Sequence, residues 1–360
     1  MRPPDPPFAL LAELTHRCPL ACPYCSNPLT LARAASELET DEWRRVLDEA
    51  AKLGVLQVHF SGGEPLIRKD LELLIAHAGQ CGLYTNLITS GMALSPARAT
   101  ALAQAGLDHA QLSLQDTDAL NADLFSGSKN TLAQKTAAAA MLRAADLPLT
   151  LNAVMHRGNL AHLEAMIETA LAFGAGRLEV AHVQYYGWAL RNRAALMPTR
   201  AQIDLATQIV TAARARLSGR LVIDYVVPDY YATRPKACMG GWAQRFLNVD
   251  PAGNVLPCHA AQSIPDMHFD TVREKSLGEI WRNSAAFNRF RGAGWMPEPC
   301  QSCERREVDW GGCRCQALAL TGDAGATDPA CALSPHHAEM LATAQNEAAA
   351  PAPDFIYRRY

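Results

Sequence analysis

The stretch Cys18-Pro-Leu-Ala-Cys22-Pro-Tyr-Cys25 decides how the rest of the chain is interpreted. Its three cysteines lie four and three residues apart, shortly after the apolar run at residues 8–14. A 4Fe–4S cluster normally takes four protein thiolates. Three thiolates on one tight loop can therefore hold three irons and leave the fourth iron open to a small molecule. A zinc loop or a chance cluster of cysteines is the alternative that this stretch alone leaves open.

The composition is that of an ordinary globular protein. The chain has 360 residues, enough for one large and one smaller domain, and 49% of them are hydrophobic. The net charge of -3 disfavours nucleic-acid binding, because there is no basic excess to neutralise phosphates. We find no secretory signal and no apolar stretch of membrane-spanning length. These features predict a soluble, cytoplasmic protein that binds neither nucleic acid nor membranes.

The 11 cysteines fall into two groups. In a reducing cytosol, clustered cysteines are more often metal ligands than disulfides. Three lie in the N-terminal loop, and seven lie between residues 238 and 331. Cys81 stands alone in an apolar helical stretch, where we expect a buried core thiol. The distribution predicts two metal-bearing regions.

From residue 8 to about residue 227, strand-like and helix-like stretches alternate. Such alternation predicts right-handed βαβ units and a parallel sheet. About six units fit, fewer than the eight of a closed TIM barrel, so we expect an α/β fold with an open, partial (β/α)6 TIM-like barrel. Thr40 is the expected N-cap of the first helix. The predicted strands are 8–14, 55–60, 84–89, 110–114, 149–155 and 178–184, and the predicted helices are 41–53, 71–80, 96–105, 131–145, 160–173 and 198–217.

The pattern changes near residue 230. Regular alternation stops, glycine, proline and cysteine become more frequent, and only residues 277–290 and 335–344 are predicted to be helical. A loop-rich region with little core of its own commonly needs metal staples. We therefore predict a barrel over residues 1–230, a loop-rich Fe–S domain over residues 231–345, and a tail over residues 346–360 whose Ala/Pro stretch is mobile.

Ligands of parallel α/β folds bind at the carboxyl ends of the strands. Besides the cysteine loop, those ends carry Gly62-Gly63-Glu64-Pro65, Ser90-Gly91, Ser113-Leu-Gln115 and His182-Val-Gln184. Paired glycines let a backbone approach a ligand closely, because they have no Cβ, and Glu64 can accept from an ammonium group. An ordinary glycine turn, solvated Ser and Gln side chains, and a core histidine are the alternatives, and for His182 the core position is favoured.

The cysteine loop, with Tyr24 as its aromatic residue, and the Gly-Gly-Glu-Pro segment resemble the signatures of the radical SAM enzymes. The resemblance implies a cluster on Cys18, Cys22 and Cys25 whose open iron is chelated by S-adenosylmethionine (SAM). It also implies that the backbone of Tyr24 lies beside the adenine, and that the Gly-Gly-Glu-Pro segment holds the amino group of SAM. The cofactor-binding residues implied are Tyr24, Gly62, Gly63, Glu64, Pro65, Ser90, Ser113 and Gln115, the last two at the ribose and carboxylate.

The C-terminal cysteines resemble the SPASM domain, which binds two auxiliary Fe–S clusters in some radical SAM enzymes. The chain departs from that pattern at Asp309, where the family has cysteine. Asp309 would complete a set of eight ligands and, as a hard and exchangeable ligand, would alter the potential of its cluster. A solvated aspartate and a zinc ribbon are the alternatives here. The resemblance implies two 4Fe–4S or 2Fe–2S clusters, auxiliary I on Cys238, Cys258, Cys313 and Cys315 and auxiliary II on Cys300, Cys303, Asp309 and Cys331.

Asp309, Cys238-Met-Gly-Gly-Trp242, Ser113-Leu-Gln-Asp116 and Gln184-Tyr-Tyr-Gly-Trp-Ala-Leu-Arg-Asn-Arg193 resemble the family of coenzyme PQQ synthesis protein E (PqqE), which acts in pyrroloquinoline quinone (PQQ) biosynthesis. The resemblance implies that a 5′-deoxyadenosyl radical abstracts hydrogen from a glutamate side chain of the precursor peptide PqqA. The carbon radical then attacks a tyrosine ring of the same peptide and forms a C–C bond. The implied partners are the peptide chaperone PqqD and an electron donor such as a flavodoxin.

Two alternatives remain at this point. Another SPASM enzyme, such as a sulfatase maturase or a different peptide cyclase, would be expected to have cysteine at position 309 and no Gln-Tyr-Tyr-Gly-Trp segment. A non-catalytic zinc scaffold that recognises a protein partner would carry zinc and would not bind SAM.

Overall fold

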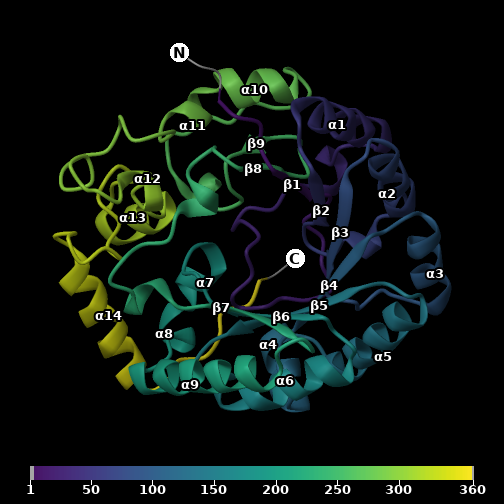
Figure 1. Ribbon diagram of the computed structural model, residues 1–360, viewed down its shortest axis with the longest axis horizontal. Coiled ribbons are helices and arrows are strands. Elements are labelled where there is room, and N and C mark those ends of the chain that lie inside the picture. Colours follow the sequence, from purple (N-terminus) through teal and green to yellow (C-terminus); the bar gives the residue numbers. More distant parts are fainter. Residues whose placement is uncertain (1–3, 359–360) are drawn as a thin grey trace.

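The computed structural model describes residues 4–358, and within them nine strands form one curved sheet in the order β7-β6-β5-β4-β3-β2-β1-β8-β9 (Figure 1). Neighbouring strands pair in parallel, except that β9 runs antiparallel to β8. The strands are β1 (Ala9–Glu13), β2 (Gln57–Ser61), β3 (Tyr84–Thr89), β4 (His109–Leu114), β5 (Leu149–Met155), β6 (Arg177–His182), β7 (Val222–Val226), β8 (Phe246–Val249) and β9 (Val255–Leu256).

Helices cover the outer face of the sheet (Figure 1). Each buries one apolar stripe against the strands, as Val46, Leu47 and Ala50 of α1 do. The barrel helices are α1 (Thr40–Leu53), α2 (Leu71–Gln80), α3 (Pro96–Gln104), α4 (Ala119–Ser126), α5 (Thr131–Ala144), α6 (Leu163–Ala172), α7 (Gly187–Arg191), α8 (Arg193–Leu196) and α9 (Arg200–Arg216). The six predicted helices are present, but the N-cap of α1 is Glu39 rather than Thr40, because Glu39 and Glu42 form a reciprocal capping box.

The parallel barrel sheet is longer than six strands. The strand β7 adds a seventh parallel strand beside β6, and β8 from the cysteine-rich region pairs with β1 on the other side. Leu10 stands opposite Leu247 in this second pairing, and both side chains are buried. The predicted division near residue 230 therefore lies within a continuous sheet, and the cysteine-rich region is anchored to the strand that precedes the cysteine loop.

The cysteine-rich region has more regular structure than the sequence predicts. The single helix expected over residues 277–290 is two helices, because Ser284 adopts an extended backbone between them. The helices of this region are α10 (Leu277–Asn283), α11 (Ala285–Asn288), α12 (Arg306–Asp309), α13 (Arg314–Thr321) and α14 (His337–Ala349). No helix within residues 4–358 is long and apolar enough to cross a membrane.

The C-terminal stretch predicted to be mobile has contacts at both of its ends. Ala348 is buried in the last turn of α14. The Arg157 guanidinium donates to the carbonyl oxygens of Ala348 and Ala350, at 3.3 and 3.2 Å. Beyond the helix, the side-chain oxygen of Asn192 accepts from the backbone nitrogen of Ile356 at 2.7 Å. The stretch between these contacts is exposed and has no regular structure. The chain then continues (yellow) to the centre of the ring of elements in Figure 1.

Candidate active site

The cysteine loop lies at the carboxyl end of β1. The backbone nitrogen of Cys25 donates to the carbonyl oxygen of Cys22 at 3.0 Å, which closes the loop in a tight turn. Burial raises the pKa of Cys18 to about 11 and that of Cys22 to about 12, and it also raises the pKa of Cys25. Three thiols gathered in a poorly solvated place become thiolates only if positive charge compensates them. Iron ions supply such charge, so the donor set fits an iron–sulfur cluster.

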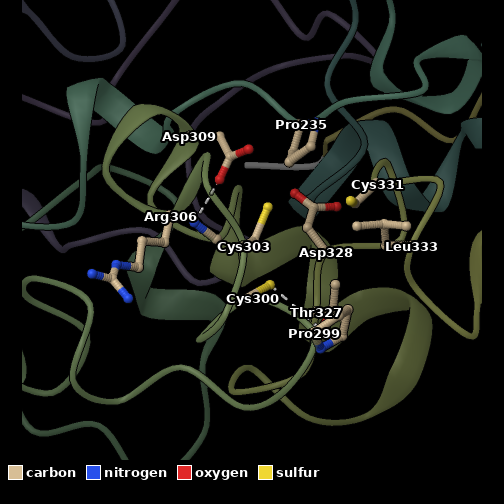
Figure 2. Close-up of a pocket in the computed structure, with 11 residues that line it drawn as sticks. Pro235, Pro299, Cys300, Cys303, Arg306, Asp309, Thr327, Asp328, Cys331 and Leu333 are labelled. Carbon is tan, nitrogen blue, oxygen red and sulfur yellow. Dashed lines mark hydrogen bonds between the residues drawn. The ribbon is translucent and has the colours of Figure 1, made fainter.

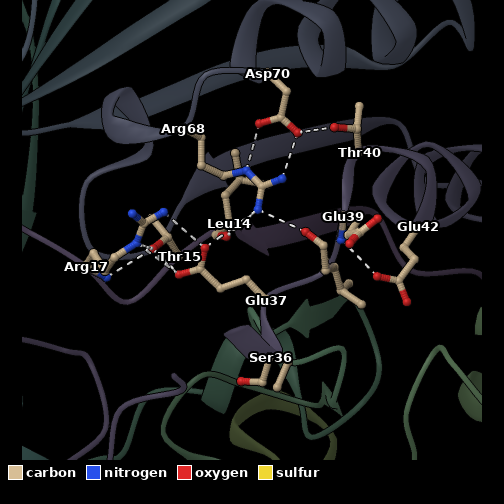
Figure 3. Close-up of polar contacts among 12 residues, drawn as sticks. Leu14, Thr15, Arg17, Ser36, Glu37, Glu39, Thr40, Glu42, Arg68 and Asp70 are labelled. Carbon is tan, nitrogen blue, oxygen red and sulfur yellow. Dashed lines mark hydrogen bonds and ion pairs between the residues drawn. The ribbon is translucent and has the colours of Figure 1, made fainter. Parts of the chain in front are cut away.

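A buried polar network holds the backbone that leads into the loop (Figure 3). The guanidinium of Arg68 donates to both carboxylate oxygens of Asp70, at 2.9 and 2.7 Å. Its remaining nitrogen lies 3.3 Å from the carbonyl oxygen of Leu14, directly before the loop segment. Glu37 accepts from the hydroxyl of Thr15 at 2.5 Å and from Arg17 at 3.2 Å. These contacts fix residues 14–17 without using any group of the cysteine loop.

Gly62 and Gly63 pack against that same backbone. The nitrogen of Gly63 donates to the carbonyl oxygen of Thr15 at 2.5 Å, and Gly62 has a φ of +128°. A Cβ added at Gly63 would lie only 2.2 Å from the carbonyl oxygen of Arg17. The sequence predicts these glycines as a close approach to a ligand, whereas the contact that excludes a side chain is with the segment preceding Cys18.

The Glu64 side chain is buried beneath the strand ends and does not line the cavity that they surround. Its fully buried carboxylate accepts from the Thr89 hydroxyl at 2.6 Å, from the Ser90 nitrogen at 2.7 Å and from the Leu66 nitrogen at 3.0 Å, and it also bonds the Ser90 hydroxyl. This carboxylate joins the end of β2 to the end of β3. An ammonium group in the cavity would therefore meet the backbone of the Gly-Gly-Glu segment before it met the Glu64 side chain.

Lys135 of α5 connects the ends of β3 and β4. Its fully buried ammonium donates to the carbonyl oxygens of Ser90 and Ser113, at 2.9 and 2.7 Å. Burial lowers the pKa of Lys135 to about 8, while Cys22 and Glu64 act to raise it. Sequence reasoning missed this residue, because a lone lysine in an alanine-rich helix usually faces solvent.

The strand ends surround a cavity of about 500 Å³ that opens to solvent. Glu64 and Pro65 do not line this cavity, but the other six predicted cofactor-binding residues do. These six are Tyr24, Gly62, Gly63, Ser90, Ser113 and Gln115. His182 is buried, as its favoured core position predicts, and it also lines the cavity. Burial lowers the pKa of His182 to about 3, so the ring is neutral near pH 7.

The wall of the cavity is shared with the cysteine-rich region. Tyr186, from the Gln-Tyr-Tyr-Gly-Trp segment, forms a hydrogen bond with Nε2 of His259, and both residues line the cavity. His259 directly follows Cys258, one of the predicted auxiliary I ligands. Sequence reasoning selected Tyr186 by its motif and missed His259, which no local pattern distinguishes. The contact places the predicted auxiliary I site next to the cavity.

The four thiols predicted for auxiliary I lie close together, in an arrangement that we call the thiol ring. Cys238 and Cys315 each lie near enough to both Cys258 and Cys313 to perturb the pKa of those two thiols. The loop at residues 238–241, strand β9 and the start of α13 bring them together. Four converging thiols fit either a four-iron cluster or zinc by donor chemistry alone.

The predicted auxiliary II residues line a second, small cavity of about 10 Å³, shown in Figure 2. Cys300, Cys303, Asp309 and Cys331 all lie there, together with Asp328. Thr327 lies 3.5 Å from the sulfur of Cys300. The donor set of three thiols and a carboxylate fits an iron–sulfur cluster.

The carboxylates of Asp309 and Asp328 both face this cavity, and they differ in how many hydrogen bonds they accept (Figure 2). Asp328 accepts from the nitrogens of Cys313, Gln316 and Ala330, at 2.6, 2.8 and 2.9 Å. Asp309 accepts only from the Gly311 nitrogen at 3.2 Å and pairs with Arg305 at 3.6 Å. Asp309 therefore keeps more capacity to bind a metal. Asp328, which sequence reasoning missed, ties the backbone of the auxiliary I site to the auxiliary II cavity.

Cys81 is not the buried core thiol that the sequence predicts. It is partly exposed at the end of α2, and its sulfur donates to Asp48 at 3.3 Å. Nε2 of His77 lies 2.9 Å from the same carboxylate oxygen. Cys81 packs against the edge of the core as a partly buried residue, so the prediction is right about its side of the helix and wrong about its degree of burial.

Comparisons with known proteins agree with this geometry. Residues 12–170 match the radical SAM superfamily, and residues 238–304 match SPASM, an iron–sulfur cluster-binding domain. The chain is 59% identical to the PqqA peptide cyclase of Xanthomonas campestris pv. campestris (strain 8004), over 98% of this chain and 94% of that protein. It is also 59% identical to the PqqA peptide cyclase of Granulibacter bethesdensis, over 99% of this chain and 95% of that protein.

Among solved structures, the fold is similar to that of Streptococcus suis SuiB bound to S-adenosylmethionine. The TM-score is 0.76 at 18% sequence identity, and the match covers 91% of this chain and 77% of that chain. Together with the two matching domains, this similarity confirms the predicted α/β partial barrel with a C-terminal SPASM domain.

Proposed function

Since the chain belongs to the PqqA peptide cyclase family of radical SAM enzymes, we propose that it cross-links a glutamate and a tyrosine side chain of the precursor peptide PqqA through a new C–C bond. One observation carries this proposal beyond family membership. The cavity at the strand ends reaches from the three-thiol loop to a wall that includes His259, beside the thiol ring. A peptide held there lies between a source of radicals and an acceptor of electrons.

The cofactor site is proposed from the donor chemistry of the loop. Cys18, Cys22 and Cys25 hold the N-terminal cluster, which together with SAM supplies a 5′-deoxyadenosyl radical when reduced. The cavity residues Tyr24, Gly62, Gly63, Ser90, Ser113 and Gln115 bind SAM, while Glu64 and Pro65 contribute through the backbone and through the shape of the β2 end. Glu64 and Lys135 support this site indirectly, because their side chains hold the ends of β2, β3 and β4 in place.

The auxiliary sites take the partition expected from the sequence. Cys238, Cys258, Cys313 and Cys315 hold auxiliary I, because their four sulfurs converge. Cys300, Cys303, Asp309 and Cys331 hold auxiliary II, because they line one cavity and Asp309 has the less engaged carboxylate. The zinc-scaffold alternative predicted a protein that is not an enzyme, whereas this chain belongs to a family of enzymes.

The cross-link requires that PqqA loses two hydrogens. One leaves as a hydrogen atom from the glutamate side chain to the 5′-deoxyadenosyl radical. The other leaves the tyrosine ring as a proton, while an electron passes to an oxidant, for which the auxiliary clusters are the proposed acceptors. The chaperone PqqD delivers the peptide, and a flavodoxin-like donor reduces the N-terminal cluster. A cytoplasmic location stays a prediction from the sequence.

The test is an anaerobic reaction of the enzyme with PqqA, PqqD, SAM and dithionite. We expect 5′-deoxyadenosine together with a peptide that has lost two hydrogens, and fragmentation that places the link between a glutamate and a tyrosine. PqqA with deuterium on the glutamate side chains should transfer that label to 5′-deoxyadenosine. Formation of 5′-deoxyadenosine without deuterium, together with an unchanged peptide, would contradict the proposed substrate while leaving SAM cleavage intact.

A further inference from the structure

The C-terminal end of the described chain returns to the cysteine loop. The Arg358 side chain is only 4% exposed, and one of its nitrogens donates to the carbonyl oxygen of Leu20 at 2.7 Å. Its other terminal nitrogen lies 3.7 Å from the sulfur of Cys25, within the range of an N–H···S hydrogen bond. When the Asn27 amide is oriented to satisfy both its groups, its oxygen accepts from Arg358 at 3.1 Å and its nitrogen donates to Gly62 at 3.2 Å. The guanidinium therefore sits inside the proposed cluster site.

Several contacts hold the tail in this position. Asn192 pairs with both backbone groups of Ile356, at 2.7 and 2.9 Å, and its amide also donates to the carbonyl oxygen of Pro23 in the cysteine loop at 3.0 Å. The Tyr357 hydroxyl donates to the carbonyl oxygen of Leu124 at 2.8 Å. The Asn192 side chain thus joins the tail to the cysteine loop, and the two residues that precede Arg358 are both held by hydrogen bonds.

The chemistry of arginine suits this position. Its guanidinium keeps its charge at any accessible pH and offers several donors in a planar fork. One terminal nitrogen of this fork lies beside the sulfur of Cys25, which is a proposed cluster ligand. Hydrogen bonds to cluster sulfurs are among the factors that set iron–sulfur potentials. A fixed positive charge favours the reduced cluster over the oxidised one, because reduction adds negative charge.

We propose that Arg358 is a positioning residue of the N-terminal cluster, which holds the cysteine loop through Leu20 and makes the cluster easier to reduce through Cys25. The inference rests on the proposed function, because it needs a cluster on the three-thiol loop. It assigns a role in cofactor reduction to a tail that lies 333 residues from Cys25 in the sequence.

The experiment compares Arg358→Gln, Arg358→Met and Arg358→Lys in the reconstituted holoenzyme. The control is Arg157→Gln, which also removes tail contacts but lies away from the cysteine loop. An anaerobic redox titration followed by EPR measures the midpoint potential of the cluster whose signal changes when SAM is added. The auxiliary clusters of the same molecules serve as the internal reference.

We expect Gln and Met to shift the reduction equilibrium about tenfold toward the oxidised cluster, which is about 59 mV for a one-electron couple. Lys should restore most of that shift, and the auxiliary potentials and the control should stay at the wild-type values. Loss of the N-terminal cluster in Gln and Met but not in Lys would also support the proposal. A wild-type potential in a loaded Gln or Met variant would overturn it, as would loss of the cluster in all three variants. A wild-type enzyme without a SAM-sensitive signal would instead contradict the proposed function.

Discussion

Replacing Arg68 with methionine should destabilise the whole barrel, because Arg68 connects the β1 end to the start of α1. Its guanidinium, 8% exposed, pairs with Asp70 and donates to the carbonyl oxygens of Leu14 and Leu38. Burial acts to raise the pKa of Asp70, but hydrogen bonds from Arg68 and Thr40 leave it below its usual value. Methionine keeps the apolar stem and removes every one of these donors.

The expected loss of stability follows from the groups that lose their partner when Arg68 is replaced. Removing one partner of a buried ion pair costs about 3–5 kcal/mol, because the other charge stays buried without compensation. Two carbonyl oxygens also lose a charged donor. A chain of 360 residues unfolds with an entropy of about 0.8 kcal/mol/K. The expected decrease in Tm is therefore about 4–7 °C.

The assay is anaerobic thermal unfolding of the reconstituted protein, followed by circular dichroism. Arg200→Met is the matched control, because Arg200 also pairs with an aspartate, Asp204, at 3.0 Å, but both side chains are more than half exposed. An exposed pair contributes about 0–1 kcal/mol, so the control should lose about 1 °C or less. Equal decreases in Tm for Arg68→Met and Arg200→Met would refute the view that a buried network fixes the loop segment.

Three further predictions address the site itself. Gly63→Ala should lower SAM cleavage about tenfold or more while the auxiliary iron stays bound, because the added Cβ would lie 2.2 Å from a carbonyl oxygen; Gly79→Ala, where nothing lies within 4 Å, should cleave SAM normally. His156 and His182 have pKa values lowered by burial from 6.5 to about 3, so the unfolded state binds protons first, and stability should fall as the pH decreases from 6.5 toward 3 by up to about 4–5 kcal/mol for each; an acid titration in which His182→Phe keeps the wild-type curve would disagree. Asp309→Ala should lose iron from one auxiliary cluster, whereas Asp309→Cys should keep that iron and change its potential, and equal iron in wild type and Asp309→Ala would exclude Asp309 as a ligand.

The barrel was predictable because its signals are local, and the three N-terminal cysteines are close in the sequence. The alternation of strands and helices is visible in the spacing of apolar residues, and it ends near the point where cysteine becomes frequent. The cysteine spacings bring the donors of each loop together before any tertiary contact forms. Asp309 stood out because the SPASM pattern that the chain resembles has a cysteine at that position.

What the sequence did not predict depends on contacts between distant residues. Lys135 and His259 have no local pattern, and they matter because the fold places them against strand ends and a thiol ring. The Ala/Pro composition of the tail predicts mobility, yet Arg157 and Asn192 capture its backbone groups. Arg358 acquires its position through the Asn192 contacts and through its own bond to Leu20. Polar side chains that bind a passing backbone are not visible in composition.

The most direct test of the account compares wild type with a Cys18/Cys22/Cys25→Ala triple variant, both prepared anaerobically. Iron and sulfide are measured first, and 5′-deoxyadenosine is then measured after SAM and dithionite are added. The account predicts that wild type holds more iron than one cluster and cleaves SAM, and that the variant keeps the auxiliary iron but does not cleave SAM. Cleavage by the triple variant, or zinc in place of iron in the wild type, would contradict it.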